Sequence, residues 1–173
     1  DVSVPPNTNP LSPEELTRAE ALLPLLEGKQ EFWAMGEFVH LGEPSVPALI
    51  KALAMVKMAA ARANFDCGQF DERILRGIEG ACQEIIDGRL HDQFRLDVFQ
   101  GGAGTSTNMN ANEVIANRGL ELMGFARGEY QHLHPLEHVN MSQSTNDVYP
   151  TAVKVALRFE IDRLRAAMAA LRR

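Results

Sequence analysis

Apolar residues recur every three or four positions along most of this 173-residue chain, and this spacing constrains the fold more than any other feature. Such a period places the apolar side chains on one face of an α-helix. No run shows the strict apolar–polar alternation that a half-buried strand requires. The pattern therefore predicts an all-α protein of one domain or one domain plus a small appendage, with helices over residues 12–28, 46–64, 72–87, 111–123 and 151–171.

The residues at the ends of these helices support their boundaries. Ser12-Pro13-Glu14-Glu15 combines a helix cap with a proline at the first helical position. Glycines follow several of the apolar runs, as at Gly88 and Gly124, where a helix can end. Residues 1–11 are rich in proline and asparagine, which predicts a disordered lead-in.

Composition and charge exclude several classes of partner. The formal net charge is −6, and phosphate binding needs clustered Lys and Arg, so we expect no nucleic-acid partner. No apolar run reaches membrane-spanning length and no signal-peptide pattern is present, so we expect no membrane partner. Cys67 and Cys82 are too few for a disulfide framework and are interpreted as small apolar core residues. These features predict a cytoplasmic protein.

Two segments rich in small polar residues carry most of the functional information. They are residues 101–110, Gly101-Gly102-Ala103-Gly104-Thr105-Ser106-Thr107-Asn108-Met109-Asn110, and residues 140–147, Asn140-Met141-Ser142-Gln143-Ser144-Thr145-Asn146-Asp147. Each precedes a predicted helix, whose N-terminus offers unpaired N–H groups and a positive dipole end. The segments therefore predict a site for a small, multiply negative, oxygen-rich molecule. On local grounds, ordinary helix capping explains each segment about as well.

Five histidines, namely His40, His91, His132, His134 and His138, raise the alternative of a metal site. No carboxylate–histidine pattern on a helix accompanies them. We interpret them as solvated or hydrogen-bonded structural residues, and we expect neither a metal site nor a cofactor.

Several further runs follow one another in a fixed order from Ala48 onward. They are Leu49–Leu53, His91–Phe94, Asp97–Ser106, Asn108–Asn117, Gly128–Tyr130 and His138–Thr151. This ordered set resembles the aspartase/fumarase superfamily, and most closely its aspartate ammonia-lyase branch. The resemblance implies residues 48–148 as the lyase N-terminal domain and residues 149–173 as the first helix of the central helical bundle, truncated in this chain.

The resemblance implies reversible elimination of ammonia from L-aspartate to give fumarate. Removal of a proton beside a carboxylate gives an aci-carboxylate, which carries two negative charges. Neutral hydrogen-bond donors in a dry pocket can stabilise these charges. By resemblance, Thr105 binds the substrate. Ser144, Thr145 and Asn146 would then hold a carboxylate or the amino group of that substrate. Three neighbouring asparagines, Asn108, Asn110 and Asn112, would hold the first polar segment rigid. Members of the family are tetramers, so the resemblance implies a homo-oligomer. It also implies a small dicarboxylate as the ligand.

The sequence departs from the family pattern in the residues that carry out catalysis. The family's catalytic serine lies on a Gly-Ser-Ser loop followed by Met-Pro and Lys, and this chain contains neither that run nor the family's Thr-His pair. We therefore expect this chain to hold substrate-binding residues but no catalytic residue, and to be inactive alone. Fumarases of the family bind a second dicarboxylate at a His-Pro-Asn-Asp run. This chain has His134-Pro135-Leu136-Glu137 at that place, which does not match the run needed for that second site.

Two other functions remain open from the sequence. Residues 41–53 resemble one HEAT-type helical repeat, and residues 12–47 form an atypical HEAT-like segment in place of the family's usual N-terminal run. One alternative is therefore a non-enzymatic, protein-binding helical module fused to a lyase-derived segment. The other is a relative of class II fumarases, which would act on malate.

Overall fold

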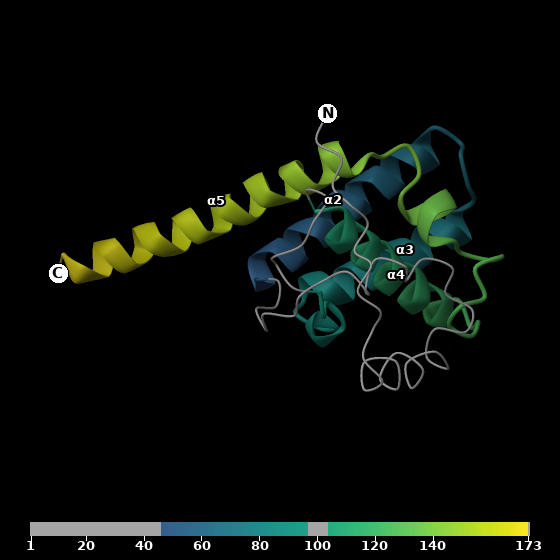
Figure 1. The fold of residues 1–173 in the computed structure, drawn as a ribbon, viewed down its shortest axis with the longest axis horizontal. Helices are drawn as coiled ribbons and strands as arrows, with labels where there is room; N and C mark the ends of the chain where they lie inside the picture. Colours follow the sequence, from purple (N-terminus) through teal and green to yellow (C-terminus); the bar gives the residue numbers. More distant parts are fainter. Residues whose placement is uncertain (1–45, 97–103, 173) are drawn as a thin grey trace, which may run out of the picture. The chain divides into compact units, whose positions relative to one another are not determined.

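Four α-helices and two short helical turns make up the regular structure of residues 46–96 and 104–172, the part of the chain that this computed structural model describes. In chain order (Figure 1) they are α2 (Pro47–Asp66), α3 (Glu72–Ile86), η2 (His91–Gln93), α4 (Thr105–Leu122), η3 (Pro135–Val139) and α5 (Thr145–Leu171). No strand occurs among these residues, so the prediction of an all-α fold is confirmed. The predicted lead-in and almost all of the HEAT-like segment lie outside the described residues.

The first two described helices begin and end close to their predicted bounds. Pro47 opens α2, where a proline is tolerated because the first N–H groups of a helix have no intrahelical acceptor. Asp71 caps α3, since its carboxylate accepts the backbone N–H of Ile74 at 3.0 Å. The predictions of 46–64 and 72–87 agree with the observed 47–66 and 72–86 to within two residues at every end.

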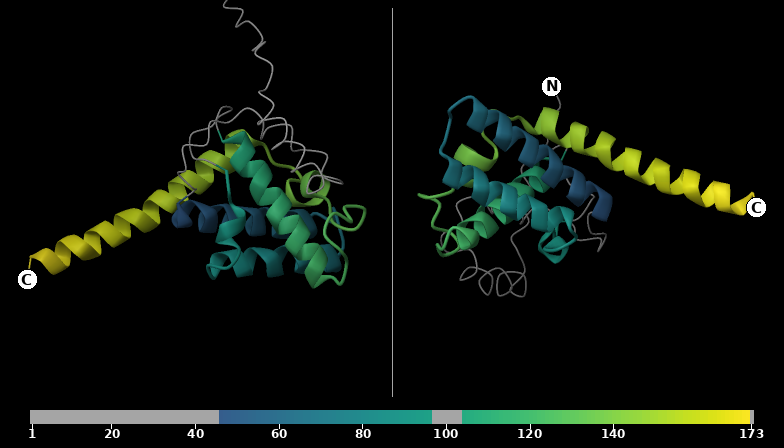
Figure 2. Two further views of the ribbon diagram at one scale, coloured as in Figure 1. Left: turned by 60° about the horizontal axis from the view of Figure 1, so that its bottom comes forward. Right: turned by 180° about the vertical axis from the view of Figure 1, so that it is seen from behind.

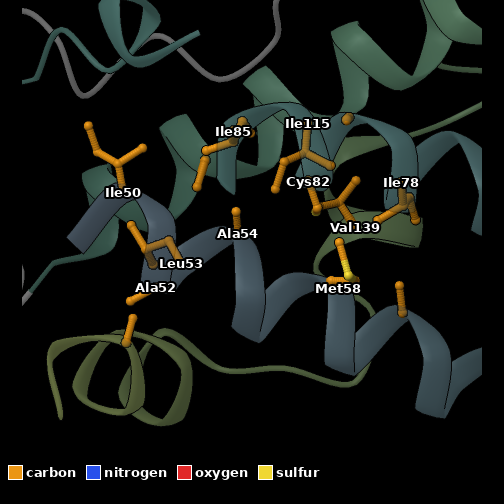
Figure 3. Packing of buried hydrophobic residues seen from close by; sticks show 14 of the residues in the cluster. Ile50, Ala52, Leu53, Ala54, Met58, Ile78, Cys82, Ile85, Ile115 and Val139 are labelled. Carbon is orange, nitrogen blue, oxygen red and sulfur yellow. The ribbon is translucent and has the colours of Figure 1, made fainter. Parts of the chain in front are cut away.

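The core forms where α2 packs against α3 and α5, and where α3 packs against α4. Figure 3 shows Leu53 of α2, Ile78, Cys82 and Ile85 of α3, and Ile115 of α4 gathered on the same interior. All five side chains are fully buried. The interpretation of Cys82 as a core residue is therefore confirmed. That of Cys67 is wrong, because Cys67 is the exposed C-cap residue where the chain leaves α2.

The two helices that follow the polar segments begin earlier than predicted. α4 begins at Thr105 rather than at residue 111, and α5 begins at Thr145 rather than at residue 151. Small polar residues are poor helix formers in helix interiors but are favoured at N-termini, so the spacing of apolar residues missed these first turns. Pro150 lies inside α5 and cannot donate a hydrogen bond to the preceding turn.

The second half of α5 is almost uncovered by the described residues. Its buried side chains are Val148, Ala152 and Ala156, all in the first half. Beyond them an exposed apolar stripe runs through Leu157, Ile161, Leu164, Met168 and Leu171. Both views of Figure 2 show this half of α5 leading away from α2, α3 and α4. No helix among the described residues is both long enough and apolar enough to cross a bilayer.

Candidate functional site

The structure brings the two polar segments together at the N-termini of α4 and α5. Asn108 on α4 donates through its side-chain amide to the Thr145 hydroxyl at 3.1 Å and to the Asn140 side-chain oxygen at 3.2 Å. Thr145 is the first residue of α5, and Asn140 lies in the turn before it. Two helix N-termini therefore meet, and each contributes the positive end of its dipole.

Gly104 is the residue that lets these two helix ends approach. It caps α4 in the left-handed region, with φ of +91°. A β-carbon at this position would lie 2.4 Å from Cγ of Tyr149, in the second turn of α5. The glycine is therefore needed both for its conformation and for the space that the Tyr149 ring occupies.

The four predicted substrate-binding residues all lie on these helix ends. Thr105 is exposed at the start of α4. Ser144 caps α5: its hydroxyl oxygen accepts the N–H of Asn146 at 3.2 Å, and its own N–H donates to the Asp147 carboxylate at 3.2 Å. Ser144 and Asn146 are exposed, whereas Thr145 is half-buried.

Capping and ligand binding are compatible roles for the hydroxyl groups. The oxygens of Ser144 and Thr145 both act as acceptors in the contacts above. A hydroxyl that accepts a hydrogen bond keeps its own proton for donation to another group. The local geometry that caps α5 therefore leaves both hydroxyls able to donate to an anion.

A network of buried amides lies behind these helix ends. The side-chain oxygen of Asn140 accepts from Lys57 at 2.8 Å, from Asn108 at 3.2 Å and from Asn112 at 3.2 Å. Asn108 and Asn112 are 1% and 0% exposed. Asn110 instead donates to the Gln93 carbonyl at 3.3 Å, which ties α4 to η2. Asn110 thus contacts backbone, whereas Asn108 and Asn112 contact other side chains, and the rigidity predicted for the segment stays a prediction.

The sequence interpretation missed Lys57, the charged residue of this network. Its side chain is fully buried, and it also donates to the Gln143 side-chain oxygen at 3.0 Å. Burial lowers its pKa from 10.5 to about 7, and the negative charge of Asp147 opposes part of that shift. A signal was present, because Lys57 shares the helical register of the buried residues Leu53, Ala54, Ala61 and Asn64.

The histidines of the described residues serve structural contacts. His134 caps η3: its Nδ1 accepts the N–H groups of Leu136 and Glu137 at 3.1 and 3.2 Å. His138 Nδ1 accepts the N–H of His134 at 2.8 Å. The His132 ring stacks on Phe125 with centroids 3.8 Å apart. Within residues 46–96 and 104–172, no group of three His, Cys, Asp or Glu side chains is placed to hold a metal ion.

Comparison with known proteins assigns the family. A sequence profile of the lyase family matches residues 29–173. Aspartate ammonia-lyase of Helicobacter pylori strain J99 is 56% identical over 128 residues, which are 74% of this chain and 27% of that protein. The chain belongs to the aspartase/fumarase superfamily of lyases. The resemblance found in the sequence is thereby confirmed at the level of the family.

Solved structures of family members share the fold. The native form of a Brucella melitensis protein described as a fumarate lyase:delta crystallin matches with a TM-score of 0.77 and 55% identity, over 79% of this chain and 32% of that one. The class II fumarase of Schistosoma mansoni matches with a TM-score of 0.66 and 36% identity, over 71% of this chain and 26% of that one. The chain thus spans less than a third of each of these family members.

Proposed function

We propose that this chain provides substrate-binding segments of an enzyme that reversibly eliminates ammonia from L-aspartate to give fumarate. The observation that carries the proposal is the meeting of two helix N-termini, with the Thr145 hydroxyl held by Asn108 at 3.1 Å. The similarity to an aspartate ammonia-lyase supports aspartate as the substrate. In this proposal Thr105, Ser144, Thr145 and Asn146 hold the dicarboxylate.

The chemistry explains why neutral donors suit this position. Proton removal beside a carboxylate places a second negative charge on it, so donors already aimed at that carboxylate bind the intermediate more tightly than the substrate. Ser144 and Thr145 donate from hydroxyls, and the helix dipoles of α4 and α5 add positive potential. No residue of the chain is proposed as the base, since the sequence lacks the family's catalytic serine run. No cofactor is part of the proposal, and we place the protein in the cytoplasm.

Association with further copies is part of the same proposal. The exposed apolar side chains of α5, from Leu157 to Leu171, are spaced alternately four and three residues apart. This is the spacing of a helix that packs along its length against other helices. We propose that this stripe is covered in a homo-oligomer, with a tetramer as the expected form.

A hybrid enzyme tests the proposed reaction. In the hybrid, the stretch of this chain that matches the H. pylori aspartate ammonia-lyase replaces the corresponding stretch of that enzyme. We expect it to release fumarate from L-aspartate, followed by ultraviolet absorbance, at a rate within about tenfold of the parent enzyme. A hybrid that assembles like the parent but does not act on aspartate would overturn the proposal.

The second candidate is a fumarase-type reaction on malate. The 36% identity to the class II fumarase favours it as the alternative, although it is lower than the 56% identity to the aspartate ammonia-lyase. The same hybrid distinguishes the two, because each substrate can be offered separately. Turnover of malate in preference to aspartate would replace the first proposal with the second.

A further inference from the structure

Lys57 is the only charged side chain that is fully buried within residues 46–96 and 104–172. It lies on the face of α2 that packs against α3 and α5. A cation in such a place is unfavourable unless its hydrogen atoms find acceptors. Its two acceptors, the side-chain oxygens of Asn140 and Gln143, belong to the same short turn before α5.

Lys57 and its acceptors organise that turn. The Gln143 amide donates to the carbonyls of Val139 and Met141 at 2.9 and 3.1 Å, and Asn140 donates to the carbonyl of Gln143 at 3.3 Å. Ser142 adopts a left-handed conformation, with φ of +59°, which is unusual for a residue other than glycine. The turn therefore depends on side-chain contacts, and Lys57 holds both amides that make them.

The same contacts connect Lys57 to the predicted anion site. Lys57 donates to the Asn140 oxygen, which also accepts from Asn108, and Asn108 donates to the Thr145 hydroxyl. Three hydrogen bonds thus lead from the amine to a predicted substrate-binding residue. Asn64, which lies two helical turns beyond Lys57 on the same face of α2, donates to the Met141 carbonyl at 2.9 Å and fixes the same turn.

The surroundings of the amine make its charge responsive to an anion. The titratable groups that face it are the Cys82 thiol of α3 and the Asp147 carboxylate at the start of α5, while α4 and the turn present amides. The side-chain oxygens of Asn108 and Asn112 are buried and accept no hydrogen bond from the described residues. With a pKa of about 7, the amine is close to half-protonated at neutral pH.

We propose that Lys57 is a positioning residue for the dianion site: its amine fixes the turn that leads into α5, and its positive charge favours a dicarboxylate bound at the N-terminus of that helix. This inference rests on the proposed function for the identity of the anion. By linkage, a dianion bound nearby raises the pKa of Lys57, so binding is accompanied by proton uptake.

The positioning half is tested on the full chain without any ligand. Lys57→Met removes the donor while keeping an apolar stem, and Lys51→Met, on a partly exposed residue of the same helix, is the control. Amide hydrogen exchange at residues 140–147 is expected to become at least about tenfold faster in Lys57→Met and to stay unchanged in Lys51→Met. Unchanged exchange in Lys57→Met would overturn the proposal. Should Lys57→Met not fold, Gln143→Leu keeps Lys57 in place, and the same acceleration is required of it.

The charge half is tested in the hybrid enzyme with fumarate as an inhibitor, because its carboxyl groups stay ionised across the range used. Fumarate affinity is expected to fall about tenfold between about pH 6 and about pH 9 in the hybrid, and this dependence should vanish in Lys57→Met. If Lys57 served only the structure, Lys57→Met would lower fumarate affinity by the same factor at every pH. That result would overturn the role proposed for the charge. An inactive hybrid that does not bind fumarate would refute the proposed function, while the exchange measurement still decides whether Lys57 positions the turn.

Discussion

The amine of Lys57 shows how a buried polar group can define a structure. Its two amide acceptors lie 2.8 and 3.0 Å away, and both belong to the turn that precedes α5. Burying an amine lowers the stability of the fold. Any movement of the turn would break the two hydrogen bonds of the amine and leave it without acceptors, which would cost still more. The turn is therefore held in one arrangement at a cost to overall stability.

That cost predicts a pH dependence of folding. Lys57 has a pKa of about 7 when folded and 10.5 when unfolded, so between these values the unfolded chain binds more protons and stability rises with pH. Burial raises the pKa of Cys82 from 9.0 to about 12, which reverses the trend only above about pH 9. We expect the free energy of unfolding to rise by roughly 2 kcal/mol between about pH 7 and about pH 9. Urea titrations should show this rise in the natural chain and not in Lys57→Met.

Gly104 allows a second prediction at the scale of one residue. Gly104→Ala places a β-carbon against the Tyr149 ring at a φ of +91°, whereas Gly88→Ala has a similar φ of +94° and meets no atom within 4 Å. The left-handed conformation alone costs about 1–2 kcal/mol for alanine. Urea denaturation should therefore show a distinctly larger loss for Gly104→Ala than for Gly88→Ala. Equal losses would mean that the Tyr149 ring does not limit the approach of α4 and α5.

At the scale of the helices, apolar spacing was sufficient to predict α2 and α3 but not the starts of α4 and α5. The missing turns contain Thr105 to Asn110 and Thr145 to Pro150, where no apolar stripe is present. What begins these helices is local capping by Gly104 and by the Ser144–Asp147 pair. Propensity alone could not identify these starts, because the same residues also favour turns.

The sequence predicts the residues at the two helix ends as a site, but it does not predict the residues behind them. Thr105 and residues 144–146 were found through polar density and the family resemblance, and the structure places them on neighbouring helix ends. Lys57 was not predicted because lysine is nearly always exposed in folded proteins, although it lies among the buried residues of α2. Its partners Asn140 and Gln143 are 83 and 86 residues away, and no local pattern indicates such a contact.

The start of α5 can be tested through its capping box. Asp147→Ala removes the acceptor for the Ser144 N–H and the acidic group in the first turn, which should cost about 0.5–2 kcal/mol and loosen the first turn of the helix. Asp162→Ala removes an exposed aspartate from the same helix and is the control. Amide exchange at residues 145–149 should accelerate only in Asp147→Ala. Equal exchange in the two variants would show that the box does not hold the helix start.

At the scale of the whole molecule, the apolar stripe on α5 predicts association. Leu164 is 59% exposed within the stripe, and Ala166 lies two residues away on the same exposed stretch, off the stripe. Leu164→Glu should lower the measured mass in sedimentation to that of a smaller species, because a charge cannot be buried between helices without a partner. Ala166→Glu, which introduces the same charge outside the stripe, should leave the mass unchanged. Loss of association in both variants would mean that the added charge, and not the apolar stripe, controls association.

The meeting of α4 and α5 also brings together residues about 40 positions apart in the sequence. Asn108 contacts Thr145 across this junction, and Tyr149 packs on Gly104. Each helix end brings neutral donors and a positive dipole end, so the junction suits an anion.

The most direct measurement is kcat/KM for aspartate in the hybrid enzyme carrying Thr145→Val, beside Thr151→Val as the matched control on the exposed side of α5. Valine keeps the shape of threonine and replaces its hydroxyl with a methyl group. If the Thr145 hydroxyl stabilises the dianion, kcat/KM should fall about 100-fold in Thr145→Val, by analogy with the loss of one oxyanion donor, and stay within about twofold in Thr151→Val. An unchanged kcat/KM in Thr145→Val would contradict the assignment of these helix ends as the dicarboxylate site.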